Sequence, residues 1–209
     1  SRSPHDCQRH QTPTGKRLMT DLAAILRRYG VLREGHFLLT SGRHSDFYFE
    51  KFRILEHPPV CETFAGELAK HFSSYDITVV CGPTTGGVIV AYEVARQLNA
   101  RCVIAERNET GRCIRRGFRL SQSDRVLLVD DVMTTGGSIR ETLAALAEHP
   151  APVVGIGVFI DRSTGITLPL PFHAAYRHQV TSYEPSSCPL CQSGVPLEEP
   201  GRGSRITKQ

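Results

Sequence analysis

The chain has 209 residues, of which 40% are hydrophobic and 22% are charged, and its formal net charge is +4. This length suits one α/β domain with small additions, and no apolar run approaches the ~20 residues that a helix needs to cross a bilayer. Seven cysteines, an odd number, do not resemble the disulfide framework of a secreted protein. We therefore expect a globular, cytoplasmic protein with no membrane partner.

Three segments are expected along the chain. Residues 1–18 are polar and contain no apolar stretch, so they are predicted to be a disordered N-terminal extension and not a secretory signal. Residues 19–178 carry the periodic hydrophobic pattern of a single domain. Residues 179–209 are expected to be a C-terminal tail that contains the turn CPLC.

The hydrophobic pattern of the middle segment alternates between helices and buried strands. Helical spacing of apolar residues predicts helices at about 20–29, 60–72, 88–99 and 138–148. Short β-branched apolar runs predict strands at 77–81, 102–106, 126–130, 153–160 and, less regularly, 172–177. Residues 82–87 form a turn and residues 107–121 a polar, arginine-rich loop. This order predicts an α/β fold with a mostly parallel central sheet and flanking helices, whose ligands bind beyond the carboxyl ends of the strands.

The segment DDVMTTGGS (130–138) joins one predicted buried strand to the next helix. Its hydroxyls, its glycines and the start of the helix suit a phosphate. Asp130 and Asp131 would repel that phosphate, so they must face another part of the ligand, such as the vicinal hydroxyls of a ribose. The alternative is a simple Asp cap and glycine turn, but the whole string favours a site for a phosphorylated sugar.

Two other phosphate-binding loops are excluded by their missing residues. The turn GPTTGGV (82–88) lacks the Lys and Ser/Thr of a P-loop. No G-x-G-x-x-G follows any predicted strand.

The segment VLLVDDVMTTGGS (126–138) resembles the signature of type I phosphoribosyltransferases, which bind phosphoribosyl pyrophosphate (PRPP). FLLTSGRHSDFYFEKFRI (37–54) and DRS (161–163) resemble motifs of the orotate phosphoribosyltransferase family, and the resemblance covers about 20–178. CPLCQSGVPLEEPG (188–201) is similar to the tail of a short bacterial branch of that family. The resemblance implies the type I phosphoribosyltransferase fold with a small N-terminal hood, and a homodimer.

The resemblance also implies roles for individual residues. Arg107, at the start of a mobile loop that closes over a neighbouring subunit's site, and Asp131 would be catalytic, and Thr134, Arg162 and His44 would bind orotate. No side chain is expected to be a direct metal ligand, because Mg2+ would be carried by PRPP and lie near Asp130 and Asp131. PRPP would be bound by Asp130, Asp131, Val132, Met133, Thr134, Thr135, Gly136, Gly137, Ser138, Thr84, Thr85, Gly86, Arg107, Arg115 and Arg116.

The chain departs from the family pattern at its cationic positions. Asn108, Gly86 and His44 stand where lysines are common in the family, and the loop 107–121 contains no lysine. Arginines must then supply the pyrophosphate contacts, and Arg112, Arg115 and Arg116 are the candidates. A solvated basic loop is the alternative.

Two further features of the sequence each allow two interpretations. His44 is either a hydrogen-bond donor to the substrate or a plain loop histidine. Cys188 and Cys191 form one C-x2-C, but a structural zinc site needs two more ligands and no second cysteine pair is present. A reduced pair in a C-terminal turn is preferred, with zinc shared between subunits as the alternative.

The predicted function is that of an enzyme, an orotate phosphoribosyltransferase (a glycosyltransferase of the pentosyl class) in pyrimidine biosynthesis. It would use Mg2+, PRPP and orotate and form orotidine 5′-monophosphate and pyrophosphate. The alternatives are a purine-base phosphoribosyltransferase and a PRPP-binding regulatory protein without catalysis. The sequence has no helix-turn-helix extension and no basic patch interleaved with aromatic residues, so no nucleic-acid partner is expected.

Overall fold

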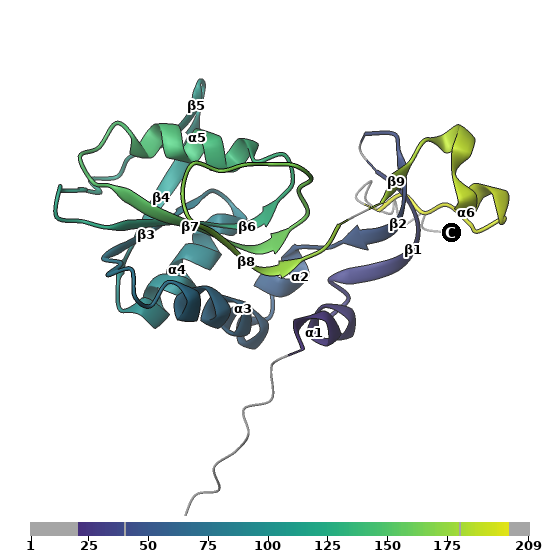
Figure 1. The fold of residues 1–209 in the computed structure, drawn as a ribbon, viewed down its shortest axis with the longest axis horizontal. Coiled ribbons are helices and arrows are strands. Elements are labelled where there is room, and N and C mark those ends of the chain that lie inside the picture. Colours follow the sequence, from purple (N-terminus) through teal and green to yellow (C-terminus); the bar gives the residue numbers. More distant parts are fainter. Residues whose placement is uncertain (1–20, 40, 180, 201–209) are drawn as a thin grey trace, which may run out of the picture.

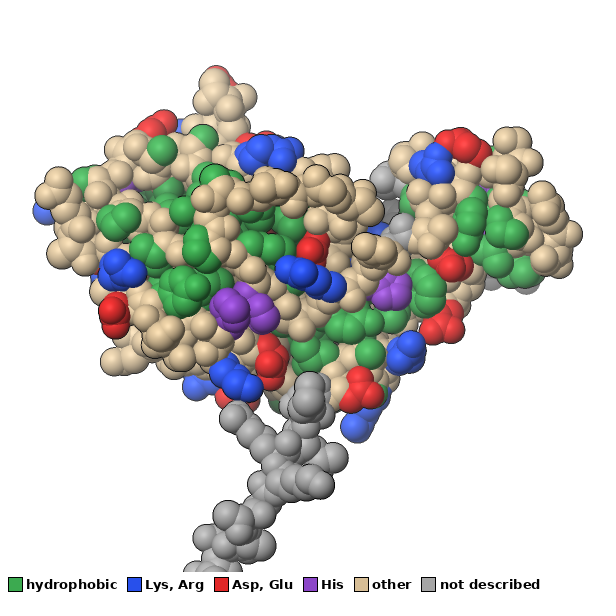
Figure 2. Space-filling model, viewed as in Figure 1, with side chains coloured by type: hydrophobic (Ala, Val, Ile, Leu, Met, Phe, Trp, Pro, Cys, Tyr) green, Lys and Arg blue, Asp and Glu red, His purple; other side chains and the backbone are tan. Residues whose placement is uncertain are grey.

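The computed structural model describes residues 21–39, 41–179 and 181–200, so the extension predicted at 1–18 and the end of the tail at 201–209 lie outside the described residues. The described chain forms a core around a six-stranded sheet and a smaller lobe, the hood, around a three-stranded sheet (Figure 1). Figure 2 shows the hood as a lobe beside the core, with a notch between the two. The predicted mostly parallel sheet with flanking helices and a hood is confirmed.

The core sheet has the strand order β5-β4-β3-β6-β7-β8. All neighbours in it are parallel except β4 and β5, which form an antiparallel hairpin. The strands are β3 (Val79–Pro83), β4 (Arg101–Asn108), β5 (Gly111–Ile114), β6 (Val126–Met133), β7 (Val153–Asp161) and β8 (Phe172–Arg177).

Successive residues of the central strands face opposite sides of the sheet, as the pleat requires. Val80 and Leu127 belong to the core cluster on one face, whereas Val79 and Leu128 belong to the cluster on the other. Both faces are buried, which explains why these strands read as continuous apolar runs in the sequence.

Helices cover both faces of the core sheet. Helices α3 (Pro58–His71) and α4 (Gly86–Leu98) pack on one face, and α5 (Gly137–Leu146) packs on the other (Figure 1). Glycines in β7 let the α3 face approach closely, because a Cβ at Gly155 would lie 2.6 Å from the ring of Phe72. The apolar pattern of VVGIGVFI is thus interrupted where an aromatic ring needs the space.

The hood contains residues from both ends of the described chain. Helix α1 (Leu22–Arg28) precedes strands β1 (Leu32–Leu38) and β2 (His44–Phe49), and the short helix α2 (Phe52–Leu55) leads into the core. Strand β9 (Ser182–Tyr183) pairs with β2, and is followed by a 3-10 turn (Pro185–Ser187) and helix α6 (Pro189–Gln192).

The C-terminal segment therefore packs on the hood, where the sequence had suggested a tail outside the domain. Besides the β9 pairing, backbone hydrogen bonds of 2.8 Å join Leu38 N to Glu198 O and Glu198 N to His36 O. Arg43 binds both the carbonyl and the hydroxyl of Ser182 and pairs with Glu184.

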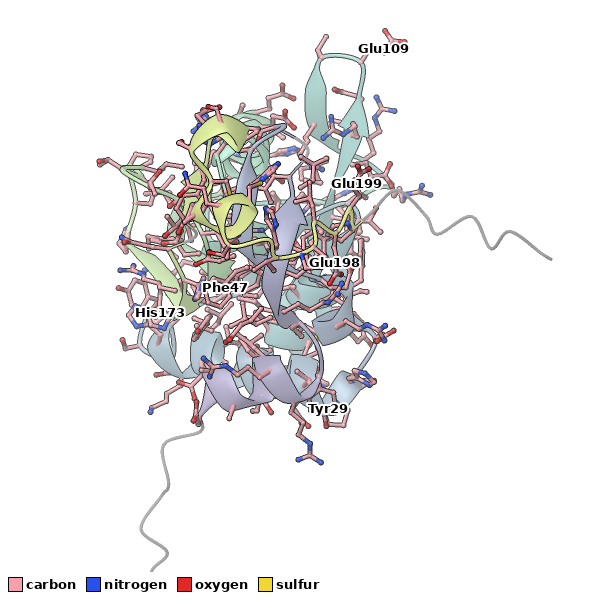
Figure 3. The ribbon with its side chains drawn as sticks, turned by 90° about the vertical axis from the view of Figure 1, so that its right-hand side faces the viewer. Tyr29, Phe47, Glu109, His173, Glu198 and Glu199 are labelled. Carbon is pink, nitrogen blue, oxygen red and sulfur yellow. The ribbon has the colours of Figure 1, made fainter. Side chains whose placement is uncertain are left out.

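The segment 107–121 differs from the predicted loop. Strand β4 continues through Asn108 and turns into β5, so only the part after Ile114 is irregular. Figure 3 shows this hairpin projecting from the core with Glu109 at its tip. Among the residues that the structure describes, no helix has both the length and the apolar character needed to cross a membrane.

Candidate active site at the carboxyl edge of the sheet

Four connections meet at the edge where the parallel strands of the core end. They follow β3, β4, β6 and β7, and they include the small or charged segments that the sequence singled out. Because neighbouring parallel strands end at the same edge, these segments come together in space.

The two acids lie at the end of β6, before its last two residues, and both are buried. Asp130 Oδ1 accepts a hydrogen bond of 2.9 Å from the backbone N of Asp131, and Asp131 Oδ1 accepts one of 2.7 Å from Val132 N. Burial, together with the neighbouring charge of Asp131, raises the pKa of the Asp130 carboxyl. The second oxygen of Asp131 lies 2.9 Å from Lys51 Nζ. A buried pair of neighbouring carboxylates that repel each other suits hydroxyl or cation ligands.

The turn after β6 presents hydroxyls and backbone N–H groups at the start of α5. Thr134 and Thr135 are exposed, whereas Gly136 is buried with φ +72°, a conformation that favours glycine. Helix α5 then begins at Gly137 and presents its free N–H groups and positive dipole end. This geometry agrees with the phosphate site expected from the sequence.

The side chains of Val132 and Met133 pack into the two core clusters on opposite faces of the sheet. They can therefore meet a ligand only through the backbone.

The turn between β3 and α4 lies beside the two acids. A Cβ at Gly86 would lie only 2.0 Å from Asp131 Oδ2, so this glycine leaves room for the carboxylate. Thr84 N donates to Ala105 O at 3.0 Å, which fixes the turn to the neighbouring strand β4. Gly86 and Gly87 thus lie against the Asp pair, and the PRPP contacts of Thr84, Thr85 and Gly86 stay predictions.

Arg112 connects the two turns. It lies on β5, and only 4% of its side chain is exposed. Its Nη1 donates to Thr84 O at 3.2 Å and its Nη2 to Ser138 Oγ at 3.2 Å, while Nε lies 3.4 Å from Glu141 Oε2. Of the three candidate loop arginines, Arg112 is the one that bonds both of these turns.

The other loop arginines are directed to solvent. Arg107 is exposed and 3.9 Å from Glu141 Oε2. Arg116 is exposed and pairs with Glu106, and Arg115 is exposed as well. Their roles in PRPP binding therefore stay predictions.

Arg162 lies directly after β7, beside an aromatic group supplied by the hood. Its guanidinium stands 4.8 Å from the ring centroid of Phe49, and its backbone N donates to Met133 O at 2.9 Å. Burial lowers the pKa of Arg162. The Nε of Arg162 and the Nε2 of His178 are both buried without a hydrogen-bond partner. Buried polar atoms without partners are rare, and here they mark a place for a polar ligand.

His44 lies at the other end of strand β2 from Phe49. The five residue steps from one position to the other span about 16 Å on an extended strand. The His44 ring contacts His36 and Cys191, so the structure places it in a separate group within the hood. Its assignment to orotate is not supported by any contact with Arg162 among the described residues.

Three residues of this region were not singled out from the sequence. Lys51 and Phe49 belong to the hood motif FYFEK, where their type alone gave no role. His178 follows β8, and its ring packs at 5.2 Å against that of Phe49. Burial, followed by the charge of Arg162, lowers the pKa of His178.

The fold, with these turns at its carboxyl edge, is that of a phosphoribosyltransferase. Residues 53–170 match the family model described as a phosphoribosyl transferase domain. A crystal structure of an orotate phosphoribosyltransferase from Aeropyrum pernix has the same fold, with a TM-score of 0.64 at 24% identity over 75% of this chain and 93% of that one. The predicted type I phosphoribosyltransferase fold is confirmed.

Curated relatives narrow the class to one family. The chain is 45% identical over 178 residues to an orotate phosphoribosyltransferase of Caldanaerobacter subterraneus subsp. tengcongensis, with 85% of this chain and 94% of the relative covered. It is 44% identical over 178 residues to that of Thermotoga maritima, with 85% and 95% covered. The chain belongs to the orotate phosphoribosyltransferase family.

Proposed function

We propose that the chain transfers the phosphoribosyl group of PRPP to orotate, forming orotidine 5′-monophosphate and pyrophosphate. The observation that carries this proposal is the meeting of the Asp130–Asp131 pair, the α5 start and Arg112 at one edge of the sheet. This arrangement offers acceptors for ribose hydroxyls beside donors for two anionic groups, which is the charge pattern of PRPP.

The sugar phosphate would be held from two sides. Asp130 and Asp131 would accept hydrogen bonds from the ribose hydroxyls, and Thr134 to Ser138 would donate to the 5′-phosphate. The helix start adds a positive dipole end at that phosphate. Thr84 to Gly86 and Arg112 would lie along the pyrophosphate, with Arg112 supplying a permanent positive charge.

The acidic residues also fit Mg2+. Carboxylate oxygens are the ligands that this ion prefers, and the buried Asp131 Oδ2 already faces a cation, Lys51 Nζ at 2.9 Å. Mg2+, bound with PRPP, would neutralise charge on the pyrophosphate oxygens. Asp130 and Asp131 are the residues that would hold it, directly or through water.

The reaction breaks the C1–O bond to pyrophosphate and forms a bond from C1 to a ring nitrogen of orotate, whose proton leaves to water or to the departing pyrophosphate. Negative charge grows on the departing oxygen, where the Arg112 guanidinium and the backbone N–H groups of the nearby turns can stabilise it. Arg162 would pair with the carboxylate and carbonyls of orotate through its planar fork. The Phe49 ring, beneath that guanidinium, would keep water from the base.

The turnover test mixes the purified chain with Mg2+, PRPP and orotate and follows the loss of orotate absorbance. We expect product with orotate and none with a purine base. Turnover with a purine base alone would transfer the assignment to a purine salvage enzyme. PRPP binding in a calorimeter with no product from any base would favour the regulatory alternative.

The role of Arg162 can be tested separately. We expect Arg162→Ala to raise the KM for orotate by about 100-fold and that for PRPP far less, because the lost contacts are to the base. Arg177→Ala is the control, since the exposed Arg177 pairs with Asp161 and lies one strand away. An equal rise in both KM values would contradict the assignment.

We further infer that the enzyme is a cytoplasmic homodimer. All six cysteines among the described residues are free, which agrees with a reducing compartment. Large apolar side chains on α2 and α4, including Tyr92 with 68% exposure, offer a surface for a second copy.

A further inference from the structure

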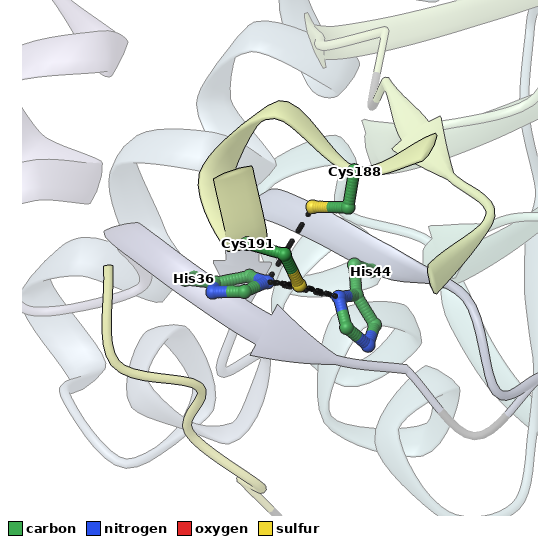
Figure 4. A group of neighbouring side chains, drawn as sticks. All are labelled: His36, His44, Cys188 and Cys191. Atoms are coloured by element: carbon green, nitrogen blue, oxygen red, sulfur yellow. Dashed lines mark hydrogen bonds between the residues drawn. The ribbon is translucent and has the colours of Figure 1, made fainter. Parts of the chain in front are cut away.

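A group of four metal-ligating side chains lies in the hood, apart from the PRPP pocket. His36 on β1, His44 on β2 and the C-x2-C cysteines Cys188 and Cys191 bring one ligand atom each to the same point (Figure 4). These atoms all lie within 4.8 Å of one another. We propose that the four residues bind one structural Zn2+ that ties the C-terminal segment to the hood.

Three nitrogen–sulfur separations in this group are close to those of a tetrahedral site. With Zn–N of about 2.0 Å and Zn–S of about 2.3 Å, the nitrogen and sulfur ligands should stand about 3.5 Å apart. The observed distances are 3.5 Å from Cys188 Sγ to His36 Nε2, 3.7 Å from Cys191 Sγ to His36 Nε2 and 3.3 Å from Cys191 Sγ to His44 Nδ1. The two ring nitrogens are 2.9 Å apart, so a bound ion would open them by about 0.4 Å.

The hydrogen bond on the far side of His36 fixes which nitrogen is free to bind. His36 Nδ1 lies 2.8 Å from the carbonyl oxygen of Val195, and a carbonyl only accepts, so Nδ1 carries the proton. In the neutral ring Nε2 is then a lone pair directed at His44 and both sulfur atoms. Without an ion, only one of His44 and the two thiols could donate a hydrogen bond to this lone pair, and the others would compete for it. A metal ion would instead bind all four ligand atoms. A backbone carbonyl behind a ligating histidine is the usual outer support of a metal site.

The ligand type selects the ion. Two thiolates and two imidazoles suit Zn2+ and offer no hard oxygen for Mg2+. Four protein ligands close the coordination sphere, which is typical of a structural ion and leaves no position for a substrate.

The C-terminal segment needs such an anchor. Among the described residues from 181 to 200, Cys188 alone is buried, and α6 buries no residue of its own. Val195 and Leu197 are 38% and 42% exposed. With so little apolar surface removed from water, the segment depends on a few hydrogen bonds and ion pairs. A metal crosslink is the usual addition where a hydrophobic core is too small.

The structure also answers why the C-x2-C looked incomplete in the sequence. The other two ligands are histidines of the hood strands β1 and β2, separated from Cys188 by 144 residues or more of chain. The site lies within one chain, so the alternative of zinc shared between subunits is not needed.

The experiment measures the metal content of the full-length chain, purified without metal-affinity steps, by inductively coupled plasma mass spectrometry. We expect one zinc per chain in the wild type and its loss in Cys191→Ser, because Cys191 is the exposed ligand whose replacement disturbs the fold least. Cys113→Ser is the matched control: this half-buried thiol lies on β5 outside the group, and its variant should keep the zinc.

A second measurement uses the wild type alone, so that it does not depend on a variant's folding. Replacement by Co2+ should produce the visible bands of a tetrahedral ion and a thiolate charge-transfer band in the near ultraviolet. Wild-type protein that carries no zinc after growth with zinc, or a Co2+ adduct without those bands, overturns the proposal. Zinc retained in Cys191→Ser at the wild-type level would also overturn it.

Discussion

Arg112 is the residue on which the two anion-binding turns depend. Its guanidinium bonds Thr84 in one turn and Ser138 in the other, from a nearly buried position. A lysine keeps the charge but has no planar fork, so it cannot reach both turns at once. We therefore expect Arg112→Lys to lower kcat/KM for PRPP on the order of 100-fold, measured by steady-state kinetics with PRPP varied at saturating orotate.

Arg101→Lys is the matched control for that change. Arg101 is exposed at the start of β4, the end of the strand away from the site, and pairs with Asp124, so its replacement should leave kcat/KM for PRPP within about threefold of the wild type, a change under 1 kcal/mol. Equal losses in both variants would contradict a specific role of Arg112 at the pyrophosphate.

Asp130 is a site residue whose ionised side chain lowers the stability of the fold. Burial and the charge of Asp131 raise its pKa in the folded chain above that of an unfolded aspartate. The folded state therefore binds the Asp130 proton more tightly than the unfolded state does. As pH rises from about 4 through the raised pKa, the loss of this proton lowers the free energy of unfolding.

Asp130→Asn removes that charge while its amide oxygen can still accept from Asp131 N. We expect the variant to be more stable than the wild type by on the order of 1 kcal/mol at about pH 8, with the difference vanishing toward about pH 4. Turnover should fall on the order of 100-fold, because a neutral amide is a weak acceptor for the ribose hydroxyls. Urea unfolding at the two pH values tests this. A variant that is less stable than the wild type at the higher pH would contradict it.

At the scale of elements, the β3–α4 turn is built on close backbone contacts. A Cβ at Gly82 would lie 2.0 Å from the carbonyl oxygen of Gly87, and backbone cannot move aside as a side chain can. We expect Gly82→Ala to lower the free energy of unfolding by about 3 kcal/mol, through overpacking of the turn. Denaturant unfolding followed by circular dichroism measures the change.

Gly66 in α3 provides the opposite case. A Cβ there meets only Gln97 Oε1 at 3.3 Å, the end of a flexible side chain, and a helical glycine loses conformational entropy. Gly66→Ala should therefore raise stability by about 0.5–1 kcal/mol. If Gly82→Ala were as stable as Gly66→Ala, the close contact between Gly82 and the Gly87 carbonyl would be contradicted.

The elements that depend on local pattern could be predicted from the sequence. The parallel strands appeared as apolar runs, and β8 was found with its observed bounds at 172–177. Strand β5 was missed because GRCI has only one aliphatic residue, and its stability comes from pairing with β4. The phosphate turn was found because 130–138 is contiguous. The Phe49–Arg162 contact and the His36–His44–Cys188–Cys191 group unite residues far apart in sequence, which no local pattern shows.

At the scale of the whole molecule, the pocket depends on how the two lobes meet. Phe49 belongs to the hood strand β2, whereas Arg162 follows the core strand β7. The same strand β2 carries His44 at its other end and pairs with β9. Strand β2 therefore connects the base side of the pocket to the proposed zinc site, and a rigid hood would hold the aromatic ring in place over Arg162.

The outer face of α2 and α4 carries large apolar side chains that are exposed to solvent. Phe52, Ile89 and Tyr92 are 44–68% exposed beside a groove of about 310 Å³ between α3 and α4. Exposed apolar patches of this kind are typical of interfaces. We expect the wild type to sediment at twice the 23.1 kDa chain mass, as a homodimer formed through this face.

Tyr92→Glu should shift the protein to the mass of one chain, because a dimer would have to bury the new charge without a partner. Leu197→Glu is the matched control: Leu197 is 42% exposed on the C-terminal segment, and its variant should stay dimeric. Sedimentation velocity at several concentrations separates the outcomes. If Tyr92→Glu stays a dimer with the wild-type dissociation constant, the two copies meet through another face. A wild type at the single-chain mass would instead overturn the homodimer itself, and the PRPP pocket would then have to be completed by one chain alone.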